Sequence, residues 1–267
     1  MRRMFTYVLI AVAAYGGLIA ISFIFQRNLL YHPSPGNMDP AVYGVPEMER
    51  VHIQAQDGLQ LVAWYRSAEE GKQTILFLHG NAGHIGHRSG KVKLYLDKGY
   101  GVLLLSYRGF GSNAGSPTEV NLYIDGRAAL KFLTERHVPL KKLAIYGESL
   151  GTGVAVELAR HVSINCLILE APFTSVPDLA AHHYFFLPVS LLVKDRFASL
   201  KKITEIKSPT YFIHGEFDRV IPWSFGKRLY EAAPNPKELL LITNAGHNNL
   251  YDYGVGEKVI EFLEKYH

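Results

Sequence analysis

The chain has 267 residues, of which 48% are hydrophobic and 19% are charged, and its formal net charge is +4. This length and balance suit one large globular domain with a substantial core and exclude an intrinsically disordered chain. The basic residues are scattered and form no run interleaved with aromatic residues, so we expect no nucleic-acid partner.

The single cysteine, Cys166, cannot form an intramolecular disulfide, so the fold cannot depend on oxidation. It lies in the mostly apolar run 165–169, which is typical of a buried strand. Because no basic residue stands beside it to activate the thiol, we expect a core residue and not a nucleophile.

The segment from Met4 to Phe25 carries no charged residue. Its length matches the roughly 20 residues that a helix needs to cross a bilayer. A cleavable signal peptide would have a shorter apolar core followed by a small-x-small site, which residues 23–26 do not provide. We therefore expect an uncleaved transmembrane anchor over residues 1–26.

The charges that flank this anchor bear on its orientation. Arg2 and Arg3 precede the apolar segment, whereas Arg27 follows it. Because positive charge is retained in the cytoplasm, we expect a single-pass membrane protein with the following domain on the extracytoplasmic side. A short connector over residues 27–48 contains Pro and Gly and should keep that domain near the membrane.

From residue 49 to residue 267 short apolar runs alternate with longer segments of helical pattern. Two runs flank the turn sequence Asp57-Gly58, which predicts an opening antiparallel hairpin. The later runs are continuously apolar, as expected of strands buried on both faces of a sheet. The alternation predicts an α/β domain with a mostly parallel eight-stranded sheet and helices on both faces. The expected strands are 51–54, 59–65, 74–78, 101–105, 143–146, 166–169, 211–213 and 238–242, and the expected helices are 85–98, 121–136, 150–160, 222–232 and 254–266.

The interval between Thr174 and Ser208 is too long for a plain crossover between two strands. It contains Tyr184-Phe185-Phe186-Leu187-Pro188 and Leu191-Leu192-Val193, and this apolar content argues against a disordered loop. We expect a small helical cap at about residues 175–207.

The sequence Gly147-Glu148-Ser149-Leu150-Gly151 fits the G-x-S-x-G pattern of a nucleophile elbow. It follows an expected strand and opens an expected helix, so the chain must turn sharply at the serine and expose its hydroxyl. A glycine-rich turn with an incidental serine would not need this context. The pattern therefore predicts that Ser149 is a nucleophile.

A serine hydroxyl is a weak nucleophile and needs an adjacent base, which an acidic group orients. Asp218 follows the expected strand 211–213, and His247 follows the last expected strand. Both therefore fall on the sheet edge to which Ser149 belongs. We predict the catalytic triad Ser149, Asp218 and His247, with Glu216 and Glu170 as the alternative acids.

An acyl-transfer site also needs two N–H donors for the oxyanion. The first should be the backbone N–H of Leu150, at the start of a helix where free N–H groups point outward. The second should come from the loop after strand 74–78, and we predict the backbone of Asn81, with Ala82 as the alternative. His79, in the same loop, is expected to be structural.

Nothing in the sequence fits a metal or cofactor site. The histidines at 79–87 and the pair at 182–183 lack carboxylate or cysteine partners at metal-binding spacing. The glycines of 109–115 do not fit a dinucleotide-binding pattern, and no phosphate-binding loop with a lysine is present. We therefore expect neither a metal nor a cofactor.

Six short motifs are spread along the domain: Leu78-His79-Gly80-Asn81-Ala82-Gly83, Tyr107-Arg108-Gly109-Phe110-Gly111, Ser116-Pro117-Thr118-Glu119, Gly147-Glu148-Ser149-Leu150-Gly151, Glu170-Ala171-Pro172-Phe173-Thr174-Ser175 and Ala245-Gly246-His247-Asn248. They resemble motifs of the membrane-anchored α/β hydrolases of the abhydrolase-domain, bud-emergence-protein-like family, and the resemblance covers nearly the whole chain. It implies the α/β-hydrolase fold and a serine hydrolase activity; relatives include lysophospholipid lipases and protein depalmitoylating thioesterases. One departure is Ser106, where relatives usually carry Asp, and it puts the positioning of Arg108 in doubt.

The sequence thus favours a hydrolase that cleaves a carboxylic ester or thioester through an acyl-enzyme on Ser149. The substrate would be a small molecule, a lipid or an acylated protein, and the apolar residues of the cap, such as Phe185 and Phe186, would line a channel for its acyl chain. Two alternatives remain: an aminopeptidase or amidase with the same triad, and a non-catalytic membrane-tethered binding protein.

Overall fold

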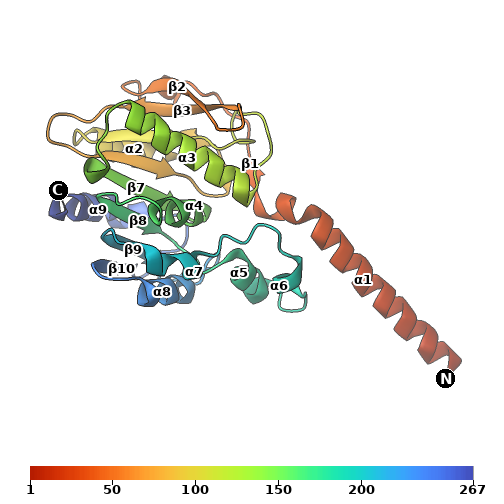
Figure 1. Cartoon of the computed structure of the whole chain (residues 1–267). Helices are drawn as coiled ribbons and strands as arrows, with labels where there is room; N and C mark the ends of the chain where they lie inside the picture. Colours follow the sequence, from red (N-terminus) through yellow and green to blue (C-terminus); the bar gives the residue numbers. More distant parts are fainter. Residues whose placement is uncertain (267) are drawn as a thin grey trace.

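The computed structural model describes residues 1–266 and places an eight-stranded sheet between two layers of helices, with one long helix projecting from this body (Figure 1). The strand order is β10-β9-β8-β7-β4-β6-β3-β2. The predicted mostly parallel α/β sheet of eight strands is confirmed. Its strands are β2 (Glu49–Gln54), β3 (Gln60–Arg66), β4 (Thr74–Leu78), β6 (Gly101–Leu105), β7 (Leu143–Glu148), β8 (Cys166–Glu170), β9 (Thr210–Gly215) and β10 (Lys237–Ile242).

The strand directions determine where a site can form. β2 pairs antiparallel with β3, and β3 pairs antiparallel with β6, as the Asp57-Gly58 turn predicts for the opening hairpin. The other pairings, from β6 through β4, β7, β8 and β9 to β10, are all parallel. The carboxyl ends of six strands therefore share one edge of the sheet, which is where sites of such sheets form.

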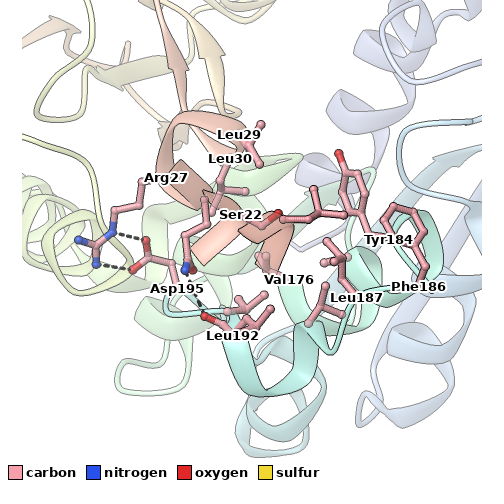
Figure 2. A pocket seen from close by; sticks show the side chains of 15 residues that line it. Ser22, Arg27, Leu29, Leu30, Val176, Tyr184, Phe186, Leu187, Leu192 and Asp195 are labelled. Atoms are coloured by element: carbon pink, nitrogen blue, oxygen red, sulfur yellow. Dashed lines mark hydrogen bonds and ion pairs between the residues drawn. The ribbon is translucent and has the colours of Figure 1, made fainter. Parts of the chain in front are cut away.

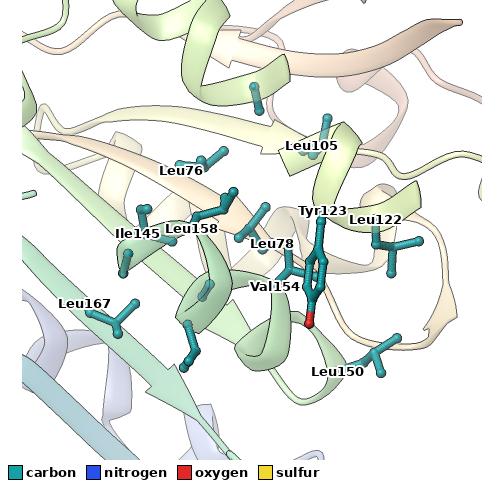
Figure 3. Packing of buried hydrophobic residues seen from close by; sticks show 14 of the residues in the cluster. Leu76, Leu78, Leu105, Leu122, Tyr123, Ile145, Leu150, Val154, Leu158 and Leu167 are labelled. Atoms are coloured by element: carbon teal, nitrogen blue, oxygen red, sulfur yellow. The ribbon is translucent and has the colours of Figure 1, made fainter. Parts of the chain in front are cut away.

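Helices cover both faces of the sheet. One face carries α3 (Glu119–Glu135), α4 (Leu150–Ala159) and α8 (Trp223–Ala232), and the other carries α2 (Ser89–Leu96) and α9 (Val255–Lys265). Figure 3 shows the first interface, where Leu76, Leu78 and Ile145 of the sheet meet Val154 and Leu158 of α4. Every residue of β4, β6 and β8 is buried, which explains their continuous apolar runs.

The expected helix 85–98 is divided, because η2 (Ile85–Arg88) precedes α2 and its first turn is capped by the His84 ring. The predicted cap consists of short helical segments, α5 (Val176–His183), α6 (Val189–Leu192), α7 (Ser199–Lys202) and η4 (Ile203–Glu205). Ser175 caps α5 by accepting a hydrogen bond from the Asp178 backbone N–H at 3.1 Å. Two further 3-10 turns are η3 (Leu140–Lys142) and η5 (Leu250–Tyr253).

The N-terminal helix α1 runs over Arg2–Leu30, past the expected end of the anchor at residue 26, and is long and apolar enough to cross a membrane. The connector that follows is packed on the domain. Its strand β1 (His32–Pro33) pairs with β5 (Ala82–Gly83), and η1 (Pro40–Tyr43) follows. The Met38 carbonyl accepts a hydrogen bond from the buried Trp64 indole at 2.9 Å.

Candidate active site

Ser149 lies at the turn between β7 and α4 with a φ of 51° and a ψ of −117°, a conformation that a non-glycine residue rarely adopts. A Cβ atom on Gly147 would lie 2.7 Å from the Gly151 carbonyl oxygen, and one on Gly151 would collide with the Leu78 carbonyl. Both glycines are therefore required by close backbone packing. The turn has the geometry of a nucleophile elbow.

The His247 ring lies between Ser149 and Asp218. Its Nε2 is 3.0 Å from Ser149 Oγ, and its Nδ1 is 2.7 Å from Asp218 Oδ2. Because an ionised carboxylate can only accept a hydrogen bond, Nδ1 carries the ring proton and donates a hydrogen bond to Asp218. The lone pair on Nε2 then faces the serine hydroxyl. The structure thus brings together three side chains that follow β7, β9 and β10.

The Asp218 carboxylate is buried and heavily hydrogen-bonded. Oδ1 accepts from the backbone N–H groups of Val220 at 2.9 Å and Ile221 at 2.8 Å. Burial by itself would raise the pKa of Asp218, but hydrogen bonds from His214, His247 and the Ile221 N–H outweigh it and lower that pKa well below its ordinary value. Asp218 therefore stays ionised beside His247 at neutral pH.

Within residues 1–266, neither alternative acid is bonded to His247. The Glu170 carboxylate accepts hydrogen bonds from Lys91 Nζ at 2.6 Å and from the Tyr146 hydroxyl at 2.5 Å. Glu216 is exposed at the surface. Among residues 1–266, the carboxylate bonded to His247 is that of Asp218.

The loop after β4 lies against the nucleophile. A Cβ atom on Gly80 would lie 3.4 Å from the Ser149 Cβ, and Asn81 follows directly. Within residues 1–266 we find no acceptor for the backbone N–H of Asn81 or for that of Leu150, the first residue of α4. Ala82, the alternative donor, lies in β5 opposite His32.

The connector holds this loop in place. The Asn81 carbonyl accepts from the His32 backbone N–H at 2.8 Å, and the Asn81 side chain donates to the Leu30 carbonyl at 2.7 Å. Sequence reasoning missed this support, because a strand of two residues has no periodicity to detect.

A charged cluster beside Ser149 was also missed. Glu148 accepts hydrogen bonds from Arg88 Nη2 at 2.6 Å and from Lys91 Nζ at 2.9 Å, and Lys91 also binds Glu170. Burial opposes ionisation of Glu148, but the two cations prevail and lower its pKa. A cavity of about 230 Å³ opens here, lined by His87, Arg88, Lys91, Glu148, Ser149, Glu170, Ala171, His247 and Asn248.

The surroundings of two other residues singled out from the sequence, His79 and Arg108, indicate structural roles. His79 is fully buried, its Nδ1 is 2.7 Å from the Gly80 carbonyl oxygen, and burial lowers its pKa to about 3, so the ring is neutral. Arg108 pairs with Asp57 and Asp125, each at 2.6 Å, so its position does not depend on a carboxylate at residue 106.

Cys166 is buried, and burial raises the pKa of its thiol to about 12. Over the described residues 1–266, no group of three or more His, Cys, Asp or Glu side chains is placed to hold a metal ion.

The cap residues differ in orientation. Tyr184, Phe186, Leu187, Leu192 and Val193 line an apolar groove. Phe185 and Leu191 do not, since each is 85% exposed. The expectation that Phe185 lines a channel is therefore wrong: it lies at the tip between two short helices and faces outward.

The sequence of this chain is similar to those of known proteins. Residues 69–200 match the family model described as serine aminopeptidase, S33. The alpha/beta hydrolase domain-containing protein WAV2 of Arabidopsis thaliana is 31% identical over 298 residues, which cover 98% of this chain and 96% of that protein. The lysophosphatidylserine lipase of Danio rerio is 34% identical over 234 residues, which cover 80% of this chain and 60% of the lipase.

Among solved structures, an esterase of Pyrococcus furiosus superposes with a TM-score of 0.71 at 25% sequence identity, covering 88% of this chain and 98% of the esterase.

Proposed function

Because the chain belongs to the family of alpha/beta hydrolase domain-containing proteins, we propose that it is a serine hydrolase that cleaves a carboxylic ester or thioester of a lipid-like or acylated substrate. The observation that carries this proposal is the position of His247, within hydrogen-bonding distance of both Ser149 and Asp218. A non-catalytic binding protein would not need this alignment.

In the proposed reaction, Ser149 Oγ attacks the substrate carbonyl carbon while His247 Nε2 takes the hydroxyl proton. Asp218 stabilises the imidazolium that forms. The backbone N–H groups of Leu150 and Asn81 would stabilise the oxyanion. His247 then gives its proton to the departing alcohol or thiol, which leaves an acyl-enzyme on Ser149. A water molecule, deprotonated by His247, attacks that acyl group and releases the acid.

The charges around the site favour an ester or thioester over a peptide with a free amino terminus. An aminopeptidase needs a carboxylate free to bind the substrate ammonium group. In the cavity beside Ser149, Glu148 and Glu170 both form ion pairs with basic side chains. In the cap, Asp195 is paired with Arg27, and Asp178 accepts from the Thr174 hydroxyl. The described part of the chain thus offers no buried, unpaired carboxylate near Ser149 for an amine.

A membrane location supports a lipid substrate. α1 is apolar over a length sufficient to cross a bilayer, and the charges of Arg2 and Arg3 favour an extracytoplasmic catalytic domain. The similarity to a lysophosphatidylserine lipase points to the same substrate class.

The proposal is tested by hydrolysis of p-nitrophenyl butanoate with purified full-length protein and two variants. Ser149→Ala should lower kcat on the order of a million-fold, as removal of a triad nucleophile does. Ser112→Ala, which removes an exposed hydroxyl, is the matched control and should keep the wild-type rate. Equal rates for Ser149→Ala and the wild type would refute the proposed nucleophile.

A further inference from the structure

An apolar groove of about 260 Å³ lies between α1 and the cap (Figure 2). Leu18, Ser22 and Leu29 of α1 form one wall. Val176, Ala180 and Leu187 of the cap are among the residues of the opposite wall. The groove is therefore shared between the helix expected to cross the membrane and the domain that carries the candidate active site.

One face of α1 is turned toward the cap. Within α1, which lies wholly in the described part of the chain, the least exposed residues are Ile19, Ser22, Gln26 and Leu30. Their spacing of three or four residues places them on a single side of the helix. A helix that served only as a tether would have no reason to pack one side against the domain.

Specific polar contacts fix this arrangement. The Gln26 side chain donates to the Leu192 carbonyl at 3.1 Å and accepts from the Lys194 backbone N–H at 2.7 Å. Arg27 forms an ion pair with the buried Asp195, with Nε 2.8 Å from Oδ2. Figure 2 shows the Arg27–Asp195 pair at one end of the groove, with Tyr184 and Phe186 toward the other.

Leu30 links the groove to the loop after β4, which lies against Ser149. Leu30 lines the groove, and its side chain packs against the buried cluster that includes Leu150. Its carbonyl accepts the hydrogen bond from the Asn81 side chain. Leu30 thus joins the groove to the loop that carries Asn81, one of the two proposed oxyanion donors.

We propose that α1 forms one wall of the acyl-binding site and that the acyl chain of a membrane lipid enters from the bilayer between α1 and the cap. This inference rests on the proposed function, and it adds the route and the binding surface of the substrate. The occupant follows from the surroundings: a groove walled by a bilayer-spanning helix opens toward hydrocarbon, and its lining is mainly apolar. The carbonyl group of the bound chain would then lie at Ser149.

The test fills the groove from each wall in full-length protein reconstituted in lipid nanodiscs. Ser22→Trp narrows it from α1, and Ala180→Trp narrows it from α5. The matched controls are Ile24→Trp, on the opposite side of α1, and Ala181→Trp, whose native side chain is exposed. The readout is the ratio of kcat/KM for p-nitrophenyl dodecanoate to kcat/KM for p-nitrophenyl butanoate.

Each methylene fully buried in the groove changes kcat/KM about fourfold, so losing two or three such methylenes lowers the ratio more than tenfold. We expect this fall in Ser22→Trp and Ala180→Trp and the wild-type ratio in both controls. The esters partition into the bilayer equally for all five proteins, so this effect cancels when the ratio of a variant is compared with that of the wild type. Measurable turnover of butanoate in each variant shows that it is folded.

A wild-type ratio in both groove variants would overturn the inference, and so would an equal fall in the controls, because filling the groove would then have no specific effect. Failure of the proposed function gives a different result. In that case the wild-type protein hydrolyses neither ester in a manner that depends on Ser149.

Discussion

The backbone carbonyl of Leu30, in the last turn of α1, accepts a hydrogen bond from the Asn81 side chain at 2.7 Å. Two residues later the His32 N–H binds the Asn81 carbonyl at 2.8 Å. Asn81 therefore bonds both to the end of α1 and to the segment that follows it, and it belongs to the loop proposed to hold the oxyanion. In this protein the end of α1 is part of the architecture around the candidate active site.

Asn81→Ala tests this relationship, because it removes the side-chain link and keeps the backbone N–H proposed as a donor. We expect kcat for p-nitrophenyl butanoate to fall about tenfold or more, since small displacements of catalytic groups are costly. Asn28→Ala, at an exposed amide in the same turn of α1, should keep the wild-type kcat. An unchanged kcat in Asn81→Ala would mean that the loop holds its position without Leu30.

Asp218→Asn tests the proposed role of Asp218 in orienting His247. The amide cannot hold His247 in the required tautomer, so kcat should fall on the order of 10⁴-fold. Glu216→Gln, at an exposed position, should leave kcat within a few-fold of the wild type, and Glu170→Gln should have a smaller effect than Asp218→Asn. If Glu170→Gln were the most damaging of the three, the catalytic acid would be Glu170, at the end of β8, and not Asp218, which follows β9.

Acid stability should depend on Glu148. Its pKa is lowered in the folded protein, so it stabilises the fold above the unfolded-state pKa of about 4.3, and this stability is lost as the pH falls toward the folded-state pKa. Glu148→Gln should therefore lower Tm by about 6 °C at pH 7, which corresponds to about 2 kcal/mol.

The difference in Tm between Glu148→Gln and the wild type should shrink between pH 5 and pH 3. Thermal unfolding of the detergent-solubilised proteins across this range measures it, with Glu216→Gln as the exposed carboxylate control. A difference that stayed constant with pH would show that Glu148 is not ionised more readily in the folded protein than in the unfolded chain.

The orientation in the membrane can be measured with a single introduced thiol. Cys166 is buried and its thiol pKa is raised, so the wild-type protein should not react with a membrane-impermeant maleimide. Ser112→Cys places a thiol at an exposed position. We expect labelling in right-side-out membrane vesicles; labelling confined to permeabilised vesicles would reverse the predicted topology.

Much of the fold could be predicted because its signals are strong and local. The buried strands β4 and β6 begin and end at the expected residues, since continuous apolar runs bounded by polar or glycine residues define them. Ser149, Asp218 and His247 could be placed on one edge because each follows a parallel strand. The distances between their side chains come from the structure alone.

The relation between α1 and the cap could not be predicted in the same way. α6 has four residues and β1 has two, which is too few to show a periodic pattern of apolar residues. The sequence therefore did not indicate that Phe185, just before α6, faces outward or that His32 pairs with another strand. The sequence feature that indicates contact between α1 and the cap is the pair Ser22 and Gln26. Two polar side chains four residues apart in an apolar helix mark one face, and that face is the one turned toward the cap.

The central claim, that Ser149 is a nucleophile activated by His247, is tested most directly by covalent labelling. The full-length protein is treated with a fluorophosphonate, digested, and analysed by mass spectrometry, in parallel with His247→Ala and Ser112→Ala. The account predicts a single phosphonylated site at Ser149 in the wild type and in Ser112→Ala, and a labelling rate reduced at least a thousand-fold in His247→Ala. Labelling at another serine, or an unmodified Ser149 in active wild-type protein, would contradict it.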